Sequence, residues 1–177
     1  LNSMREKFGK LKKRTTPLPT DFVPSKKECA LTAEEQAQVQ ERFGGINYRS
    51  VIGGILYASG GTRPDVTFAV GKLAKFSNNP GMKHFRALHW LVSYIDTNCQ
   101  RGIRFYHNAE DSPTHKLLIR NNIPIPKDGL VTFSDASWQD CPDTGRSTSG
   151  KISLINGGTV DHGSHMPVPV AMSTGEA

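Results

Sequence analysis

The spacing of apolar residues changes once along this chain of 177 residues, near residue 98, and this change limits the folds open to it. Before residue 98, three stretches carry apolar residues three and four positions apart, which is the spacing of one helix face. After it, apolar and polar residues alternate, which is typical of strands. The sequence therefore predicts an α+β fold in which a small helical part precedes a sheet.

Three helices are predicted in the first part, beginning at Tyr48, after Pro64 and after the turn at residues 78–81. The residues expected to face inward are Val51, Ile52, Ile55, Leu56 and Ser59, then Val66, Ala69, Val70, Leu73 and Phe76, then Phe85, Leu88, Leu91, Val92 and Ile95. A short polar helix over residues 31–40 precedes them, with Thr32 and Glu35 at capping-box spacing. Amphipathic helices joined by short connections can pack into a small bundle.

Strands are predicted on both sides of a proline-containing break at residues 121–126. Ile103 with Phe105, and Leu117 with Ile119, alternate with polar residues. Further strands are expected at residues 129–135 (buried), 151–156 (its hairpin partner), 159–162 (after the Gly157–Gly158 turn) and 167–172 (the sheet edge). The predicted segments are thus a basic, proline-containing linker arm at 1–30, a helical subdomain at 31–99, a strand-containing linker at 100–128 and a sheet at 129–177.

The net charge of +6 is concentrated in the arm. Residues 1–29 hold eight Lys or Arg against three acidic residues, a net +5, whereas the remaining 148 residues hold fourteen against thirteen. Lys10, Lys12, Lys13 and Arg14 are therefore candidates for non-specific attraction to phosphate backbones. A solvated, flexible arm would explain the same composition.

Cysteine usage and hydropathy exclude some classes of protein. The three cysteines form no Cys-x-x-Cys pair, so neither a disulfide framework nor a zinc knuckle is indicated, and a site built from Cys141, His162 and His165 is not favoured. No run of about 18 apolar residues occurs, so no membrane partner is expected. Arg63 and Asp65 are expected to form a structural ion pair, and Trp90 to lie in the core.

Five groups of short strings, in one consistent order, resemble copia-type retrotransposon polyproteins, and together they cover most of residues 48–177. They are Tyr48-Arg-Ser-Val-Ile-Gly-Gly-Ile-Leu-Tyr57 with Gly61-Thr-Arg-Pro-Asp65 and Phe68-Ala-Val-Gly71, Asn79-Pro-Gly81 with His84, Ser134-Asp-Ala-Ser-Trp138, Cys141-Pro-Asp-Thr-Gly-Arg-Ser-Thr-Ser-Gly150, and Val170-Ala-Met-Ser-Thr-Gly-Glu-Ala177.

The resemblance implies a place within a polyprotein. Residues 48–98 look like the helical connection behind a reverse transcriptase polymerase, whose paired aspartates would lie before residue 1. Residues from 129 onward look like the first strands of a ribonuclease H-like mixed sheet, which is incomplete here. The implied partners are RNA–DNA hybrid and the rest of the polyprotein, meaning the polymerase and the remainder of the ribonuclease H. The implied location is the cytoplasm or nucleus, within a virus-like particle of an active element.

Asp135 is the catalytic candidate. Cleavage of a phosphodiester with two divalent cations needs several carboxylates converging on them, and Mg²⁺ suits such oxygen ligands. The resemblance makes Asp135 the first of these ligands, whereas in isolation it would cap the turn towards Trp138. Glu176 should face away from the metal position, because two residues along a helix rotate a side chain by about 200°. One carboxylate cannot hold two ions, so the chain alone is expected to be inactive.

Ser137 stands where the resembling family commonly has a second Asp. The hairpin residues Arg146, Ser147, Thr148 and Ser149 carry donors suited to phosphate contacts. The first hypothesis is therefore a piece of a reverse transcriptase with ribonuclease H activity in its parent polyprotein. The alternative is a degenerate, non-catalytic remnant that binds nucleic acid.

Overall fold

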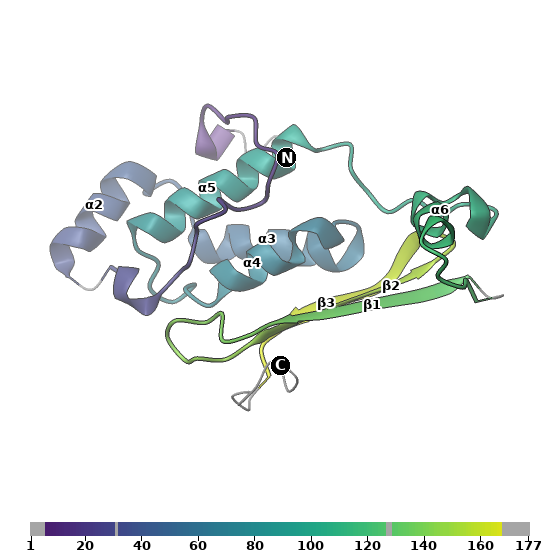
Figure 1. The fold of residues 1–177 in the computed structure, drawn as a ribbon. Coiled ribbons are helices and arrows are strands. Elements are labelled where there is room, and N and C mark those ends of the chain that lie inside the picture. Colours follow the sequence, from purple (N-terminus) through teal and green to yellow (C-terminus); the bar gives the residue numbers. More distant parts are fainter. Residues whose placement is uncertain (1–5, 31, 127–128, 168–177) are drawn as a thin grey trace.

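A computed structural model describes residues 6–30, 32–126 and 129–167. Helices lie over one half of a three-stranded sheet, and a short helix lies at the other end of the sheet (Figure 1). The elements, in chain order, are η1 (Lys26–Glu28), α2 (Ala33–Phe43), α3 (Tyr48–Gly61), η2 (Pro64–Val66), α4 (Thr67–Ala74), α5 (Met82–Thr97), η3 (Ala109–Asp111), α6 (Pro113–Arg120), β1 (Leu130–Ser137), β2 (Thr148–Ile155) and β3 (Gly158–His165). The α+β prediction is confirmed.

Local signals set the starts of the helices. The predicted capping box of α2 is present: Thr32 Oγ1 accepts from the Glu35 amide at 3.1 Å, and Glu35 accepts from the Thr32 amide at 3.0 Å. Asn47 caps α3 by accepting from the Ser50 amide at 2.9 Å. These side chains satisfy amide groups that have no partner within the first turn.

The predicted inward faces form the helical core with few exceptions. Val66, Ala69, Val70, Leu73, Leu88, Leu91 and Val92 are fully buried, and Val51, Ile52, Ile55, Ser59, Phe76 and Phe85 are nearly so. Each large apolar side chain buried in this way contributes about 1.5–3 kcal/mol to folding. The prediction was wrong for Leu56, which lies at the edge of the buried face of α3 and is 42% exposed. Ile95 is only partly buried but packs against the core.

The N-terminal arm packs on the helices as well. Phe8 is buried in the helical core beside His89. The guanidinium of Arg14 lies 3.4 Å from the centre of the Trp90 ring, and Trp90 Nε1 donates to the Thr16 carbonyl at 2.9 Å. Trp90 is therefore half-buried under the arm, and its ring holds the arm against α5.

The hairpin predictions for the sheet are confirmed. The strand order is β1-β2-β3, and both pairs are antiparallel. β1 is not buried as predicted, since Leu130 and Phe133 are 41% and 40% exposed. The helical part covers only one half of this open sheet (Figure 1), and Phe133, within that half, is only partly covered. The predicted edge at 167–172 and Glu176 lie beyond residue 167, outside the described residues.

The strands predicted between residues 100 and 120 were wrong. Within the described part of this segment there is no strand; Ile103 and Phe105 lie in an extended connection, and Leu117 and Ile119 belong to α6. Ser112 caps α6 and Pro113 occupies its first turn, both of which favour a helix start. The inward pair is His115 and Leu118, three residues apart, so Leu117 and Ile119 flank it and remain exposed.

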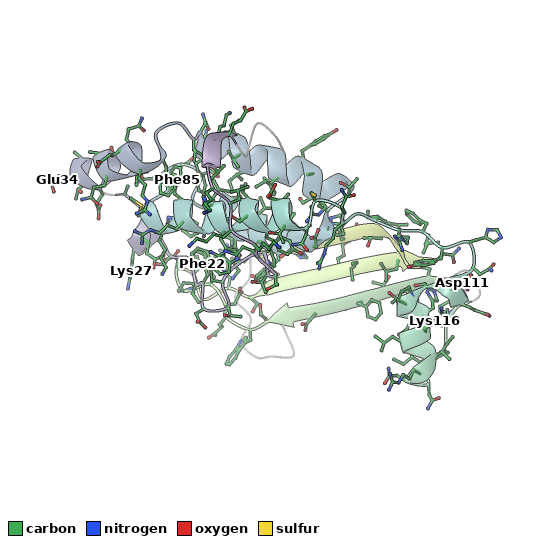
Figure 2. All side chains as sticks on the ribbon, turned by 90° about the horizontal axis from the view of Figure 1, so that it is seen from above. Phe22, Lys27, Glu34, Phe85, Asp111 and Lys116 are labelled. Carbon is green, nitrogen blue, oxygen red and sulfur yellow. The ribbon has the colours of Figure 1, made fainter. Side chains whose placement is uncertain are left out.

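The two ends of the sheet carry different neighbours. Figure 2, seen from above, places Phe22 and Phe85 in the helical part and Asp111 and Lys116 at the opposite end of the sheet. At that far end the Tyr106 amide donates to the Asn156 carbonyl in the β2–β3 turn at 3.0 Å. No helix of the described ranges is long and apolar enough to cross a membrane.

Candidate functional site

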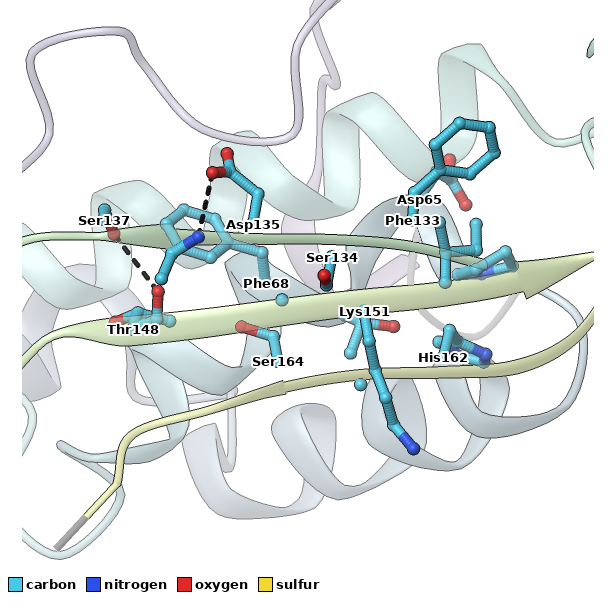
Figure 3. Close-up of a pocket in the computed structure, with 16 residues that line it drawn as sticks. Asp65, Phe68, Phe133, Ser134, Asp135, Ser137, Thr148, Lys151, His162 and Ser164 are labelled. Carbon is cyan, nitrogen blue, oxygen red and sulfur yellow. Dashed lines mark hydrogen bonds between the residues drawn. The ribbon is translucent and has the colours of Figure 1, made fainter. Parts of the chain in front are cut away.

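A groove of about 560 Å³ lies between the start of α4 and the sheet (Figure 3). Side chains at alternate strand positions share one face of a sheet. For this reason residues from all three strands line the groove together with the helix start, namely Phe133, Asp135, Ser137, Thr148, Ile152, His162 and Ser164 with Pro64, Asp65 and Phe68. The sheet and helical parts of the chain thus meet at this groove.

Asp135 lies on β1, in the groove, and is exposed. Its cross-strand partner on β2 is Gly150, which has no side chain to cover the carboxylate. Asp135 Oδ1 accepts from the Ala136 amide at 2.9 Å, so the side chain bonds its own strand and does not cap the turn at Trp138. This carboxylate is accessible from the groove.

Asp65 is the other carboxylate of the groove, and it is already held by partners. Arg63 Nε and Nη2 each donate to it at 2.9 Å, and Tyr94 Oη donates at 2.9 Å. Burial alone would raise the pKa of Asp65, but the hydrogen bonds from Arg63 and Tyr94 outweigh burial and lower it. The expected structural ion pair between Arg63 and Asp65 is confirmed.

Two further polar groups of the groove serve the structure. The His162 ring nitrogen Nε2 lies 2.8 Å from the Ser59 carbonyl on α3, which joins β3 to the helices. Ser137 Oγ donates to the Thr148 carbonyl at 3.4 Å across the hairpin. Ser137, at the position where the resembling family commonly has a second Asp, therefore bonds the opposite strand.

The described residues do not fit a two-magnesium site. The groove holds two carboxylates, and Asp65 is committed to Arg63 and Tyr94. Within the ranges that the structure describes, no three His, Cys, Asp or Glu side chains are grouped so that they could hold a metal ion. Asp135 is therefore the one accessible carboxylate in the groove, which is consistent with a single ligand but not with a complete site.

The candidate phosphate contacts fall in several environments. Thr148 is the member of the hairpin set that lines the groove, but its hydroxyl donates to Asp140 at 2.8 Å. Ser147 is buried and accepts from the Gln139 amide at 3.2 Å. Arg146 and Ser149 are half-buried.

The candidate phosphate-binding residues of the basic arm also lie in different environments. Lys10, Lys12 and Lys13 are exposed, whereas Arg14 lies on Trp90. These three lysines are therefore accessible to a phosphate backbone, whereas Arg14 helps to pack the arm against α5.

A second cleft, which no sequence pattern predicted, lies beside the groove. This cleft, of about 400 Å³, shares Pro64 and Asp65 with the groove and is also lined by Arg101 and Arg104. Both arginines lie in an irregular connection, where no periodicity marks them, and only folding brings them next to Asp65.

Comparison with known proteins relates the chain to transposon polyproteins. It is 31% identical over 163 residues to the retrovirus-related Pol polyprotein from transposon TNT 1-94 of Nicotiana tabacum, and 25% identical over 161 residues to that from transposon RE1 of Arabidopsis thaliana. These alignments cover 92% and 91% of the chain but only 11% and 9% of the polyproteins. The chain thus spans about a tenth of these relatives.

A third relative is the secreted RxLR effector protein 161 of Plasmopara viticola, 33% identical over 131 residues, of which the chain covers 80%. No family model matches the chain, and no solved structure matches it. The motifs, their order and these relatives agree, and the chain belongs to the family of copia-type retrotransposon Pol polyproteins.

Proposed function

We propose that this piece links the polymerase to the ribonuclease H of a reverse transcriptase and supplies the first strands of the nuclease. The observation that carries the proposal is the place of Asp135. It lies exposed on β1, opposite Gly150, in a groove between the sheet and the helices. A carboxylate on a hydrogen-bonded strand is held rigidly, which is what a ligand for a divalent cation requires. The partner in this function is an RNA–DNA hybrid, and the cation is Mg²⁺.

On this proposal the remaining metal ligands come from other residues of the polyprotein. Asp65 is engaged, and Asp135 by itself cannot hold two cations. The chain alone is therefore expected to leave RNA–DNA hybrid uncut in the presence of Mg²⁺. Cleavage by the purified chain that disappears with Asp135→Asn would contradict this expectation.

The decisive experiment compares two variants in a longer polyprotein that contains this chain. Asp135→Asn should reduce hybrid cleavage by at least about a hundredfold, because even the loss of an outer-shell partner of a metal ligand costs about 10–100-fold. DNA synthesis should continue. Asp161→Asn is the matched control, since Asp161 is also exposed on the same sheet, and it should preserve both activities. Equal cleavage by wild type and Asp135→Asn would refute the role of Asp135.

A second candidate function is a non-catalytic nucleic-acid-binding remnant. The observation that favours it is the exposure of Lys10, Lys12 and Lys13 on the arm. In addition, the chain covers most of one relative that bears an effector name and is not named as a polyprotein. Binding to duplex or hybrid should then weaken steeply with salt and be lost when the three lysines are changed to Gln. The absence of binding at low salt would rule this candidate out.

A further inference from the structure

The cleft that contains Arg101 and Arg104 has the composition of an anion site. Its lining residues are Thr62, Pro64, Asp65, Gln100, Arg101, Gly102, Arg104 and Tyr106. Asp65 is the one acidic residue among them, and Arg63 neutralises it through two hydrogen bonds. The two exposed guanidinium groups therefore leave the cleft with a positive charge, beside the hydroxyl of Thr62 and the amide of Gln100.

Arg101 is positioned by its neighbours in the fold. Arg101 Nη1 donates to Tyr94 Oη at 3.1 Å, and Tyr94 Oη in turn donates to Asp65 Oδ2 at 2.9 Å. Tyr94 is only 2% exposed, and its ring also lies beside the guanidinium of Arg63. A guanidinium carries five N–H donors, so Arg101 keeps most of them for a ligand while one bond fixes its orientation.

We propose that Arg101 and Arg104 bind consecutive phosphate groups of a nucleic-acid strand that continues into the Asp135 groove. Guanidinium groups bind phosphates through paired N–H donors. The cleft and the groove share Pro64 and Asp65, so one strand can follow both. This inference rests on the proposed function, because it takes the occupant of the groove to be an RNA–DNA hybrid.

The test is the binding of a short fluorescent RNA–DNA hybrid to the chain, followed by anisotropy over a range of salt concentrations. Arg101→Gln and Arg104→Gln should each weaken binding several-fold and reduce the salt slope by about 0.9, the value for one lost phosphate contact. Arg86→Gln is the matched control, since Arg86 is exposed on α5 and lines neither the cleft nor the groove. It should bind like wild type.

Arg101→Lys separates a positioned guanidinium from simple charge attraction. Lysine keeps the charge but cannot hold Tyr94 Oη and present a planar fork at the same time. The salt slope should stay near that of wild type, while the affinity should lie between those of wild type and Arg101→Gln. If Arg101→Lys bound the hybrid with the affinity of wild type, charge attraction alone would explain binding, and the proposed contact by a positioned guanidinium would be overturned.

The outcomes separate this inference from the proposed function. If wild type binds the hybrid and both Gln variants bind like Arg86→Gln, the inference is overturned and the proposed function stands. If wild type binds no hybrid at low salt, the inference fails, and the cleavage experiment with Asp135→Asn in the longer polyprotein still decides the proposed function. Binding of an acidic peptide in place of the hybrid, dependent on Arg101, would assign the cleft to a protein partner and overturn the inference.

Discussion

Lys72 on α4 and Asp140 in the β1–β2 connection form an ion pair whose side chains are only 12% and 18% exposed. Asp140 also accepts from Thr148 Oγ1 at 2.8 Å. The pair joins the helical part to the hairpin. Because both groups are largely removed from water, each depends on the other for its charge to be compensated.

Asp140→Asn should lower the free energy of unfolding by about 2 kcal/mol, the typical worth of a hydrogen bond between charged groups. Asparagine keeps the shape and can still bond Thr148, so the change removes mainly the charge. The matched control is Asp161→Asn, which breaks the solvent-exposed Lys151–Asp161 pair and should leave the free energy of unfolding close to that of wild type, because water and salt screen an exposed pair. Urea unfolding of the three proteins measures both values. Equal losses would show that the Lys72–Asp140 pair is not specially stabilising.

The Lys72–Asp140 pair should make the free energy of unfolding depend on pH under acidic conditions. Burial would raise the pKa of Asp140, but hydrogen bonds from Lys72 and Thr148 outweigh burial and lower it. The unfolded chain, with an aspartate pKa of about 3.9, therefore binds the proton first as the pH falls. The stabilisation is complete above that value and is lost as the pH falls through the lowered pKa. The difference in unfolding free energy between wild type and Asp140→Asn should accordingly stay constant down to about pH 5 and shrink as the pH falls below about 4.

Two glycines should respond in opposite ways to the same substitution. A Cβ at Gly81 would lie 1.8 Å from the Glu28 carbonyl oxygen, a backbone atom, so Gly81→Ala should destabilise the chain by more than about 1 kcal/mol. A Cβ at Gly71, inside α4, meets nothing within 4 Å. Gly71→Ala should therefore stabilise the chain by roughly 0.5–1 kcal/mol. Thermal unfolding measures both signs, and a stable Gly81→Ala variant would contradict the close packing of η1 against the start of α5.

Removing the Trp90 ring should release the N-terminal arm. Trp90→Ala removes the surface on which Arg14 lies and the donor to the Thr16 carbonyl. Cleavage by trypsin after Arg14 should then become faster, because proteases need a locally open backbone. Trp90→Phe keeps an aromatic face but loses the donor, so its cleavage rate should be intermediate. Unchanged rates in both variants would mean that Trp90 does not hold the arm.

The helical part was predictable because its signals are local. Val66, Val70 and Leu73 mark the buried face of α4 by their spacing, and Thr32 with Glu35 marks the start of α2. The hairpin pairing of β1 with β2 was also predicted, because the two strands follow one another in the chain, although their paired residues lie between 11 (Ser137 and Thr148) and 25 (Leu130 and Ile155) positions apart. The helix features depend on residues only a few positions apart.

Alternation misled the prediction where burial was the deciding factor. Leu117 and Ile119 alternate like strand residues, yet they flank the buried pair His115 and Leu118 on a helix. Phe133 belongs to an apolar strand, yet it is 40% exposed, because it lines the open groove between the sheet and α4. The pattern of one segment does not reveal which neighbour will cover it.

By itself, the sequence determined the helices α2 to α5 with most of their inward faces, the antiparallel hairpins, the family and the candidate carboxylate Asp135. Only the tertiary structure decided that Asp65 is engaged by Arg63 and Tyr94, that Asp135 is accessible in the groove, and that Arg101 lies next to that groove. The physical reason is how far apart in the sequence the interacting residues lie. Helix spacing and capping act within one or two turns, whereas the compensation of a charge depends on groups brought together from distant parts of the chain.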